Sequence, residues 1–181
     1  MGRRPILSEL PAFNSEGCLR AVIETPKGRP NKYDFNPEFA GFELAKTLPE
    51  GMTFPFDFGF IPSTQGGDGD PLDILVLMDF PAVTGCVVNA RLIGCLQAKQ
   101  KEKRKKPVRN DRFIAVARDS RTMSEVMTLS DLRPGLMDEA KEFFIQYNKI
   151  EGKRFTPLGD CNAKKALELV KVGMTKAEKR R

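Results

Sequence analysis

The stretch GGDGDPLDILVL at residues 66–77 constrains this chain more than any other part of its sequence. Three carboxylates, Asp68, Asp70 and Asp73, lie within six residues and directly precede an apolar run. Like charges this close raise one another's pKa values, so such a cluster needs a compensating cation or strong solvation. The glycines permit a sharp turn, and Pro71 fixes the backbone where the apolar run begins as a strand. We therefore expect a site for divalent cations at the mouth of a buried strand.

An all-oxygen site of this kind suits a hard ion, so the expected metal is Mg2+, with Mn2+ as an alternative. The other interpretation is a surface turn, because Asp side chains commonly bond to their own backbone in turns. A calcium loop of the EF-hand type fits poorly. Leu72 stands where that loop places a third oxygen ligand, and Asp73 stands where it needs glycine.

The chain of 181 residues contains no histidine. This absence excludes Ser-His and Cys-His nucleophilic schemes, histidine general bases and the usual zinc and non-haem iron sites. The four cysteines show no CxxC spacing, so neither a disulfide framework nor a zinc knuckle is expected. Any chemistry must therefore use carboxylates, lysines, arginines, tyrosines and a metal.

The length suits a single domain, 1–181, with a core at about 18–172. No apolar stretch approaches the roughly 18 residues of a membrane span, and the first residues lack the pattern of a signal peptide. We therefore expect a cytoplasmic protein without membrane contact. The net charge of +6 is concentrated in the run KQKEKRKKPVR at 99–109, interpreted as a solvated hairpin tip. Nucleic-acid binding is less favoured, because no aromatic residue is interleaved with these cations.

The predicted elements come as strands first and helices last. Strands are expected at 18–24, 32–34, 42–45, 72–77, 83–98 with a kink at Gly94, and 110–117. The phenylalanine-rich segment 48–61 is expected to supply core and wall. Two amphipathic helices follow, with apolar stripes at Leu136, Ala140, Phe143, Phe144 and Tyr147, and at Ala163, Ala166, Leu167 and Val170; Asp160 or Asn162 caps the second. This order indicates an α+β fold with two C-terminal helices packed on a small barrel or a strongly curved sheet, and a small closed OB-like β-barrel is the favoured form.

The motif GDGDPLD followed by an apolar strand resembles the metal-binding signature of the soluble, magnesium-dependent inorganic pyrophosphatases, which are built on a five-stranded barrel. Further segments occur in the family's order: VIE at 22–24, KYD at 32–34, FPFDFGFIPST at 54–64, FIAVA at 113–117 and FFIQYNKIEGK at 143–153. The resemblance covers roughly 18–172. It implies hydrolysis of pyrophosphate to two orthophosphates by a homo-oligomer, commonly a hexamer in bacteria.

The same resemblance implies roles for individual residues. Asp68, Asp70 and Asp73 would hold metal ions, and Asp70 would also accept the proton of the attacking water. Glu24 would lie behind these ligands in the same acidic cavity. The residues expected to bind phosphate oxygens are Lys32, Lys46, Arg112 and Tyr147.

Several positions depart from the family pattern. The substituted positions are Lys46 where Arg is usual, Phe58 where Tyr is usual, Arg112 where Lys is usual and Asn148 where Lys is usual. The Lys46 exchange replaces a bidentate fork with a point charge, and the Phe58 exchange removes a hydroxyl near the metals.

The loop that supplies two further metal-binding aspartates in the family is here the basic run. Glu102 could substitute for one of them, and so could Asp111 after a shift in register. We expect instead a depleted metal shell that is closed by water and substrate. Asn110 occupies the expected acidic position, and the surrounding positive charge opposes a further cation.

Two alternative functions stay open at this point. One is a catalytically weakened relative that binds phosphate compounds. The other is a metal-dependent phosphatase that acts on another phosphoanhydride, such as a nucleotide, which would need additional binding surface.

We predict that Asp70→Asn lowers the rate of pyrophosphate hydrolysis at least about 100-fold, because it removes the proposed proton acceptor and a metal ligand. The fold should persist, since the residue belongs to a polar loop. Phosphate release and circular dichroism measure the two effects. A variant that keeps most of its turnover would refute the assignment.

Overall fold

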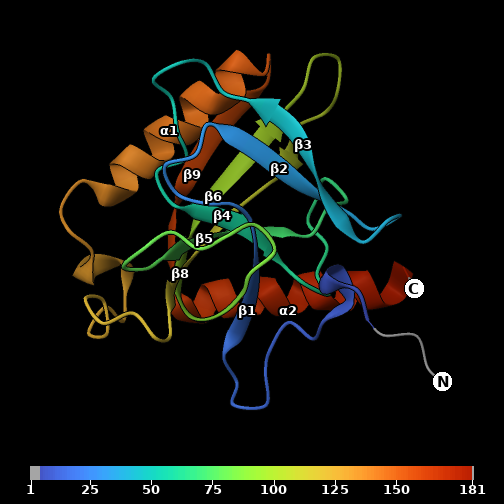
Figure 1. Ribbon diagram of the computed structural model, residues 1–181. Coiled ribbons are helices and arrows are strands. Elements are labelled where there is room, and N and C mark those ends of the chain that lie inside the picture. Colours follow the sequence, from blue (N-terminus) through green and yellow to red (C-terminus); the bar gives the residue numbers. More distant parts are fainter. Residues whose placement is uncertain (1–4, 181) are drawn as a thin grey trace.

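The computed structural model describes residues 5–180 and contains a barrel closed by five strands (Figure 1). Going round the ring, the strands are β1 (Leu19–Thr25), β4 (Asp57–Ile61), β5 (Leu72–Leu77), β8 (Arg112–Ala117) and β6 (Val87–Lys101), and β6 pairs back with β1. Neighbours are antiparallel except β5 and β8, which run parallel. Helices α1 (Leu136–Ile150) and α2 (Ala163–Arg180) pack outside the ring. The predicted barrel with two C-terminal helices is confirmed.

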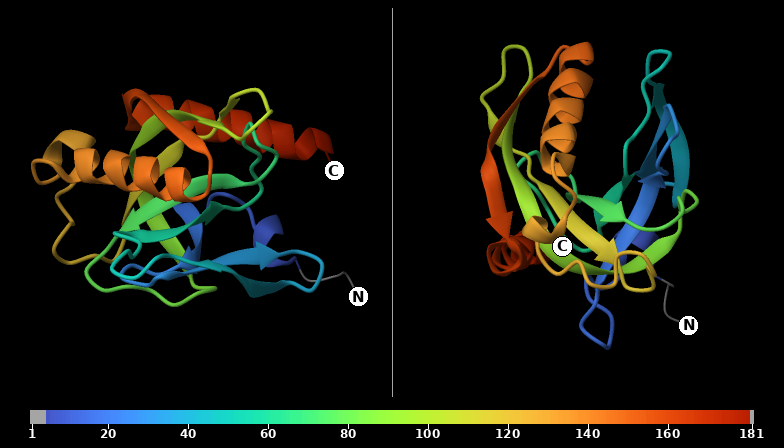
Figure 2. Two further views of the ribbon diagram at one scale, coloured as in Figure 1. Left: turned by 90° about the horizontal axis from the view of Figure 1, so that it is seen from above. Right: turned by 90° about the vertical axis from the view of Figure 1, so that its left-hand side faces the viewer.

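Four further strands lie outside the ring. β2 (Asn31–Asn36) and β3 (Gly41–Thr47) form a separate antiparallel ribbon, as the sequence predicted. β7 (Val108–Arg109) and β9 (Arg154–Asn162) both pair with the long strand β6. The right-hand view of Figure 2 shows the β2–β3 ribbon on one side of the molecule and β6, β9 and α1 on the other. Short 3-10 helices occur at Leu7–Glu9 and Leu129–Asp131.

The structure differs from the sequence prediction in several places. The run 99–109, predicted as a solvated tip, is partly strand, because β6 continues to Lys101 and β7 pairs with it; β8 begins at Arg112 and not at residue 110. β9 separates the two helices and was not predicted, because its sequence RFTPLGDCN has no clear apolar alternation and most of its residues are exposed or half-buried. β4 was hidden within the phenylalanine-rich segment. β6 begins at Val87 and not at residue 83, because the chain turns at Gly85, whose φ is +90°. The expected kink is present, since the β6–β8 register shifts between Leu92 and Gly94.

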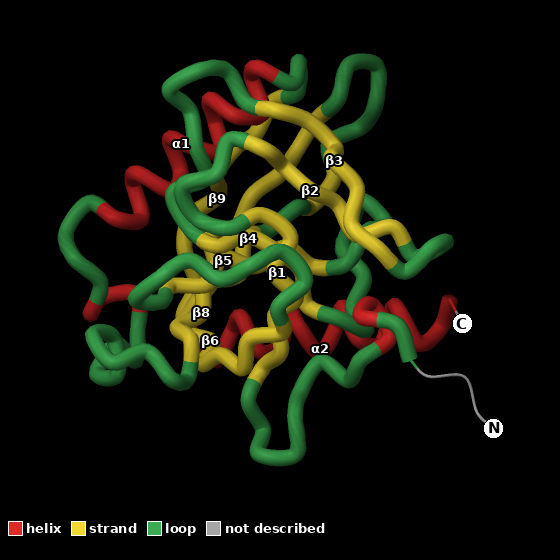
Figure 3. Tube along the Cα trace, in the orientation of Figure 1, coloured by secondary structure: helices red, strands yellow, loops and turns green. Residues whose placement is uncertain are grey.

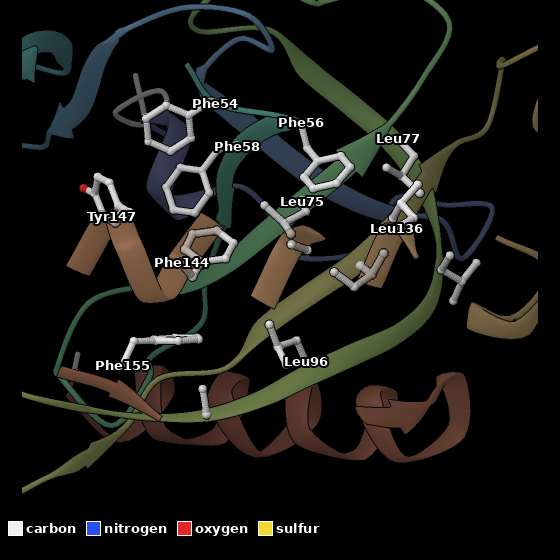
Figure 4. Packing of buried hydrophobic residues seen from close by; sticks show 14 of the residues in the cluster. Phe54, Phe56, Phe58, Leu75, Leu77, Leu96, Leu136, Phe144, Tyr147 and Phe155 are labelled. Carbon is white, nitrogen blue, oxygen red and sulfur yellow. The ribbon is translucent and has the colours of Figure 1, made fainter. Parts of the chain in front are cut away.

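Figure 3 shows the two helices, in red, against the strands, in yellow. Two apolar clusters bind these helices to the barrel. One cluster joins the barrel to α1, and Figure 4 shows aromatic side chains from β4, α1 and β9 facing one another in it, among them Phe58, Phe144 and Phe155. The other cluster joins the barrel to α2 through Ala166 and Val170. The backbone N–H of Lys165 donates to Asn162 Oδ1 at 3.0 Å, so Asn162 and not Asp160 caps α2. Among the described residues, no helix is both long and apolar enough to cross a membrane.

Closure of the barrel brings the backbones of β1 and β4 unusually close at Gly59. A Cβ atom there would lie 1.9 Å from the carbonyl oxygen of Val22. We predict that Gly59→Ala destabilises the fold by about 3 kcal/mol, because the β1 backbone must move. Urea denaturation followed by circular dichroism measures the loss. As a control, Ala45→Gly on the exposed face of β3 should cost less than about 1 kcal/mol. Equal losses in the two variants would contradict the packing argument.

Candidate active site

One polar cavity of about 560 Å³ lies between the β2–β3 ribbon, the C-terminal end of α1 and residues 65–71, which we call the aspartate loop. The structure brings to its wall eight of the residues predicted from the sequence: Glu24, Lys32, Lys46, Asp68, Asp70, Asp73, Arg112 and Tyr147. They come from strands β1, β2, β3, β5 and β8, from the aspartate loop and from α1. Side chains that are up to about 120 residues apart in the sequence therefore share one site.

The carboxylates on the acidic side of the cavity differ in exposure: Glu24 is buried, Asp73 is half-buried and Asp68 is exposed. Burial raises the pKa of Glu24 to about 7, and the nearby Lys32 ammonium only partly offsets this. Glu24 Oε1 accepts a hydrogen bond from the backbone N–H of Phe35 at 2.9 Å. Partial desolvation by the cavity wall, followed by the charges of Asp73 and Asp70, raises the pKa of Asp68 to about 6. Burial also raises the pKa of Asp73, against the opposing charge of Arg112.

These carboxylates are not gathered into a finished metal shell: within residues 5–180, no three acidic or cysteine side chains stand close enough together to hold an ion. Asp73 Oδ2 instead pairs with Arg112 Nη1 at 2.6 Å, and Asp68 Oδ1 accepts from the backbone N–H of Asp70 at 3.3 Å. The donor set nevertheless fits a divalent cation. Carboxylates with raised pKa values share one cavity, and a bound cation would supply the missing positive charge.

The basic side of the cavity consists of lysines that are held by neighbouring groups. Lys32 forms an ion pair with Asp34, and its ammonium lies 5.8 Å from the ring centre of Phe58. Lys46 forms an ion pair with Glu151, and its ammonium lies 5.5 Å from the ring centre of Tyr147. Burial lowers the pKa of Lys32. Each lysine is therefore fixed in place near the carboxylates before any anion binds.

Arg112 is the most deeply buried cation of the site. Its guanidinium pairs with Asp73 and with the side chain of Asn110, and it lies 4.8 Å from the ring centre of Phe144. Its Nε atom is the single buried side-chain nitrogen or oxygen in the described part of the chain that has no hydrogen-bond partner. A buried donor of this kind is costly unless water or a ligand oxygen satisfies it.

The two residues considered as substitutes for the missing loop aspartates are engaged elsewhere. Asp111 is buried, and its Oδ1 accepts from the backbone N–H of Ala98 at 2.9 Å and from Arg109 Nε. Glu102, on the hairpin tip, pairs with Lys105 of the tip and with Lys153, which lies between α1 and β9. Neither of the two carboxylates lines the cavity. Asp111 and Glu102 thus differ from the other predicted site residues: they stabilise the β6–β7 hairpin and its surroundings.

Further cavity residues were not predicted as site residues: Asp34, Gln100, Glu151 and Lys153. Asn148, which the sequence marked as a departure from the family pattern, lines the cavity as well. Asp34 could have been found, because it lies two positions after Lys32 on a strand and so projects to the same side. Asn148 Nδ2 donates to the carbonyl oxygen of Phe144 at 2.8 Å, so the side-chain amide is held against the backbone of its own helix, α1. The position of Glu151 depends on the docking of α1, and no local pattern reveals it.

This arrangement can hold a multiply charged anion together with divalent cations, and known proteins show the same fold. A model of the inorganic pyrophosphatase family matches residues 21–178. The chain is 36% identical over 164 residues to the inorganic pyrophosphatase of Synechocystis sp., covering 91% of this chain and 94% of that protein. The crystal structure of inorganic pyrophosphatase from Thermus thermophilus superposes with a TM-score of 0.87 at 32% identity, covering 96% of this chain and 99% of that chain.

The inorganic pyrophosphatase of Helicobacter pylori has a TM-score of 0.83 at 28% identity, covering 98% of this chain and 99% of that one. The chain therefore belongs to the inorganic pyrophosphatase family, as its motifs predicted.

The raised pKa of Glu24 yields a prediction for the metal-free protein. Because the folded state binds the proton more tightly than the unfolded state, stability falls as pH rises from about 4.5 to about 7. Glu24→Gln keeps an acceptor for Phe35 and removes the charge. It should therefore raise the free energy of unfolding by about 3 kcal/mol at pH 8 and change it little at pH 4.

Urea denaturation in the presence of a chelator at both pH values measures this difference. The exposed Glu50→Gln is the matched control and should show no comparable gain. A loss of stability at pH 8 in Glu24→Gln would show that the carboxylate is not the destabilising group.

Proposed function

We propose that this protein hydrolyses inorganic pyrophosphate to two orthophosphates and uses Mg2+ as its activating ion. The observation that carries the proposal is the cavity itself, in which carboxylates from β1, β5 and the aspartate loop face cations from β2, β3 and β8. Membership of the inorganic pyrophosphatase family supports the reaction. The alternatives, a weakened phosphate-binding relative and a phosphatase for another phosphoanhydride, are not favoured by these comparisons.

Lys32, Lys46 and Arg112 would bind the phosphate oxygens of the substrate. Arg112 would donate a hydrogen bond from its unpartnered Nε to a phosphate oxygen. This bond would explain why a buried nitrogen has no acceptor within the protein. The aromatic rings of Phe58 and Phe144 lie beside the cations and exclude water, so charge interactions there are stronger than in solvent.

Tyr147 would act as a neutral hydrogen-bond donor. Burial and the neighbouring carboxylate of Glu151 raise the pKa of the tyrosine hydroxyl, so the proton stays on the oxygen at neutral pH. A neutral donor binds a phosphate oxygen without adding to the charge that product release must overcome.

Substrate binding would exchange one set of anions for another. Asp34 and Glu151 hold the two lysines while the site is free of phosphate. Phosphate oxygens of the substrate would replace these two carboxylates as partners of the ammonium groups. The lysine side chains would therefore need to move little when substrate binds.

Asp68, Asp70 and Asp73 would hold the divalent cations, with Glu24 behind them in the buried part of the cavity. Bound Mg2+ supplies charge neutralisation and lowers the pKa of water. Asp70 accepts the proton of the attacking water in this scheme. Asp73 would exchange its pairing with Arg112 for a cation, which leaves Arg112 free to face the substrate. The basic run adds no carboxylate to the cavity, so we propose that water and substrate complete the shell.

We also propose that the protein is a cytoplasmic homo-oligomer, a hexamer by resemblance to bacterial family members. Exposed apolar side chains on β9 and α2, such as Leu158 and Val172, offer surface for contacts between copies. Nucleic acid is not a proposed partner, since the cations of the hairpin tip have no aromatic residues between them.

Phosphate release from pyrophosphate, with Mg2+, with Mn2+ and with a chelator, tests the proposed function. We expect two phosphates per substrate and a strict need for the divalent ion. Asp70→Asn should be inactive, whereas Asp119→Asn, exposed and outside the cavity, should match the wild type. Folded protein that releases no phosphate with either ion, or that prefers a nucleoside triphosphate, would overturn the proposal.

A further inference from the structure

Helix α2 lies against the aspartate loop along its C-terminal half. The backbone N–H of Gln65 donates to the carbonyl oxygen of Gly173 at 3.0 Å. A Cβ atom at position 173 would lie 2.7 Å from Leu72 Cδ1 and 3.4 Å from the carbonyl oxygen of Gln65. Because only glycine leaves this space, the helix can approach both ends of the loop closely.

The last described turn of α2 reaches the middle of the same loop. Arg180 Nη1 donates to the carbonyl oxygen of Gly69 at 3.2 Å, and Gln65 Nε2 donates to the same oxygen at 3.0 Å. Gly69 has a φ of +100° and separates Asp68 from Asp70. The peptide group between the two proposed cation-binding carboxylates is therefore held by two donors.

These contacts lie on one face of the helix. Ala166, Val170, Gly173 and Arg180 are separated by four, three and seven residues, a spacing that keeps them on the same side. Ala166 and Val170 are fully buried against the barrel, so the N-terminal half of this face anchors the helix. The C-terminal half of the same face contacts the aspartate loop. Helix α2, which packs on the barrel (Figure 1), thereby fixes the position of the loop relative to the barrel core.

The aspartate loop also meets β7. A Cβ atom at Gly67 would lie 2.6 Å from the carbonyl oxygen of Arg109. Within the loop, the backbone N–H of Gly66 donates to the carbonyl oxygen of Asp70 at 2.7 Å. The aspartate loop thus contacts both α2 and β7 and is closed by its own hydrogen bond.

We propose that α2 positions the aspartate loop for cation binding, with Gly173 setting the close approach and Arg180 acting as a positioning residue. The inference rests on the proposed function of Asp68 and Asp70. Arg180 does not line the cavity, so it acts through the loop backbone and not on the substrate.

The sign of the effect separates positioning from simple charge. Arg180 is a cation near a proposed cation site, so its removal would strengthen Mg2+ binding if Coulomb repulsion dominated. Loss of the hydrogen bond to Gly69 would weaken Mg2+ binding, because the loop must then be ordered by the ion itself.

The test is a calorimetric titration of the full chain with Mg2+ alone, together with hydrogen exchange of the peptide that covers residues 65–71. We expect Arg180→Ala to raise the dissociation constant for Mg2+ about threefold to tenfold and to speed exchange in this peptide, with a melting temperature close to that of the wild type. Arg180→Lys, which keeps a donor, should restore most of the affinity. Lys179→Ala removes the same charge from the adjacent exposed position and should change the affinity less than about twofold.

Gly173→Ala should weaken Mg2+ binding in the same direction, although alanine is the better helix former. If this variant does not fold, Arg180→Ala still decides the matter. Unchanged or tighter Mg2+ binding in Arg180→Ala would overturn the inference. Weaker Mg2+ binding in a protein that releases no phosphate from pyrophosphate would support the role of α2 and overturn only the proposed function.

Discussion

The gathering of several carboxylates in one cavity is the constraint on which the rest of this structure depends. Glu24 and Asp73 carry raised pKa values because burial removes water from charges that repel one another. A fold can tolerate this cost only if it surrounds the acids with fixed cations or with a bound ion. The barrel does so by placing Lys32 and Arg112 on strands next to the acids. The energetic conflict of the ion-free site is thus what makes it suited to cations and phosphate.

Arg112 connects the acidic groups of the cavity to the aromatic cluster that joins α1 to the barrel. It pairs with Asp73 and rests on the rings of Phe144 and Phe155, so its position depends on the docking of α1 and β9 onto the barrel. Aromatic packing, which from the sequence indicates only a core, therefore also sets the place of a charged group in the cavity. The stability of the α1 cluster and the geometry of the site are consequently coupled.

The basic run departs from the family pattern, and its polar contacts show how such a departure can change the groups around a site while the fold is kept. Asp111 and Arg109 stabilise the β6–β7 hairpin, and the side chain of Asn110 binds Arg112. The hairpin therefore contributes to the cavity by holding a cation in place, whereas the corresponding loop of the family resemblance would supply carboxylates. The aspartate loop, which contacts α2 and β7, supplies Asp68 and Asp70 to the cavity.

The sequence alone determined the aspartate cluster, most of the apolar strands and both amphipathic helices, because apolar periodicity and turn residues act over short distances. The five-stranded barrel followed from the family resemblance, since β4 could not be separated from the phenylalanine-rich segment around it. The sequence also indicated eight residues that the structure places in the cavity. Only the tertiary structure decided that β9 exists and that Asp111 and Glu102 do not line the cavity. Nor could the sequence show that Glu151 holds Lys46 or that Arg180 reaches Gly69. These features depend on pairings between segments far apart in the chain, for which a single sequence carries no local signal.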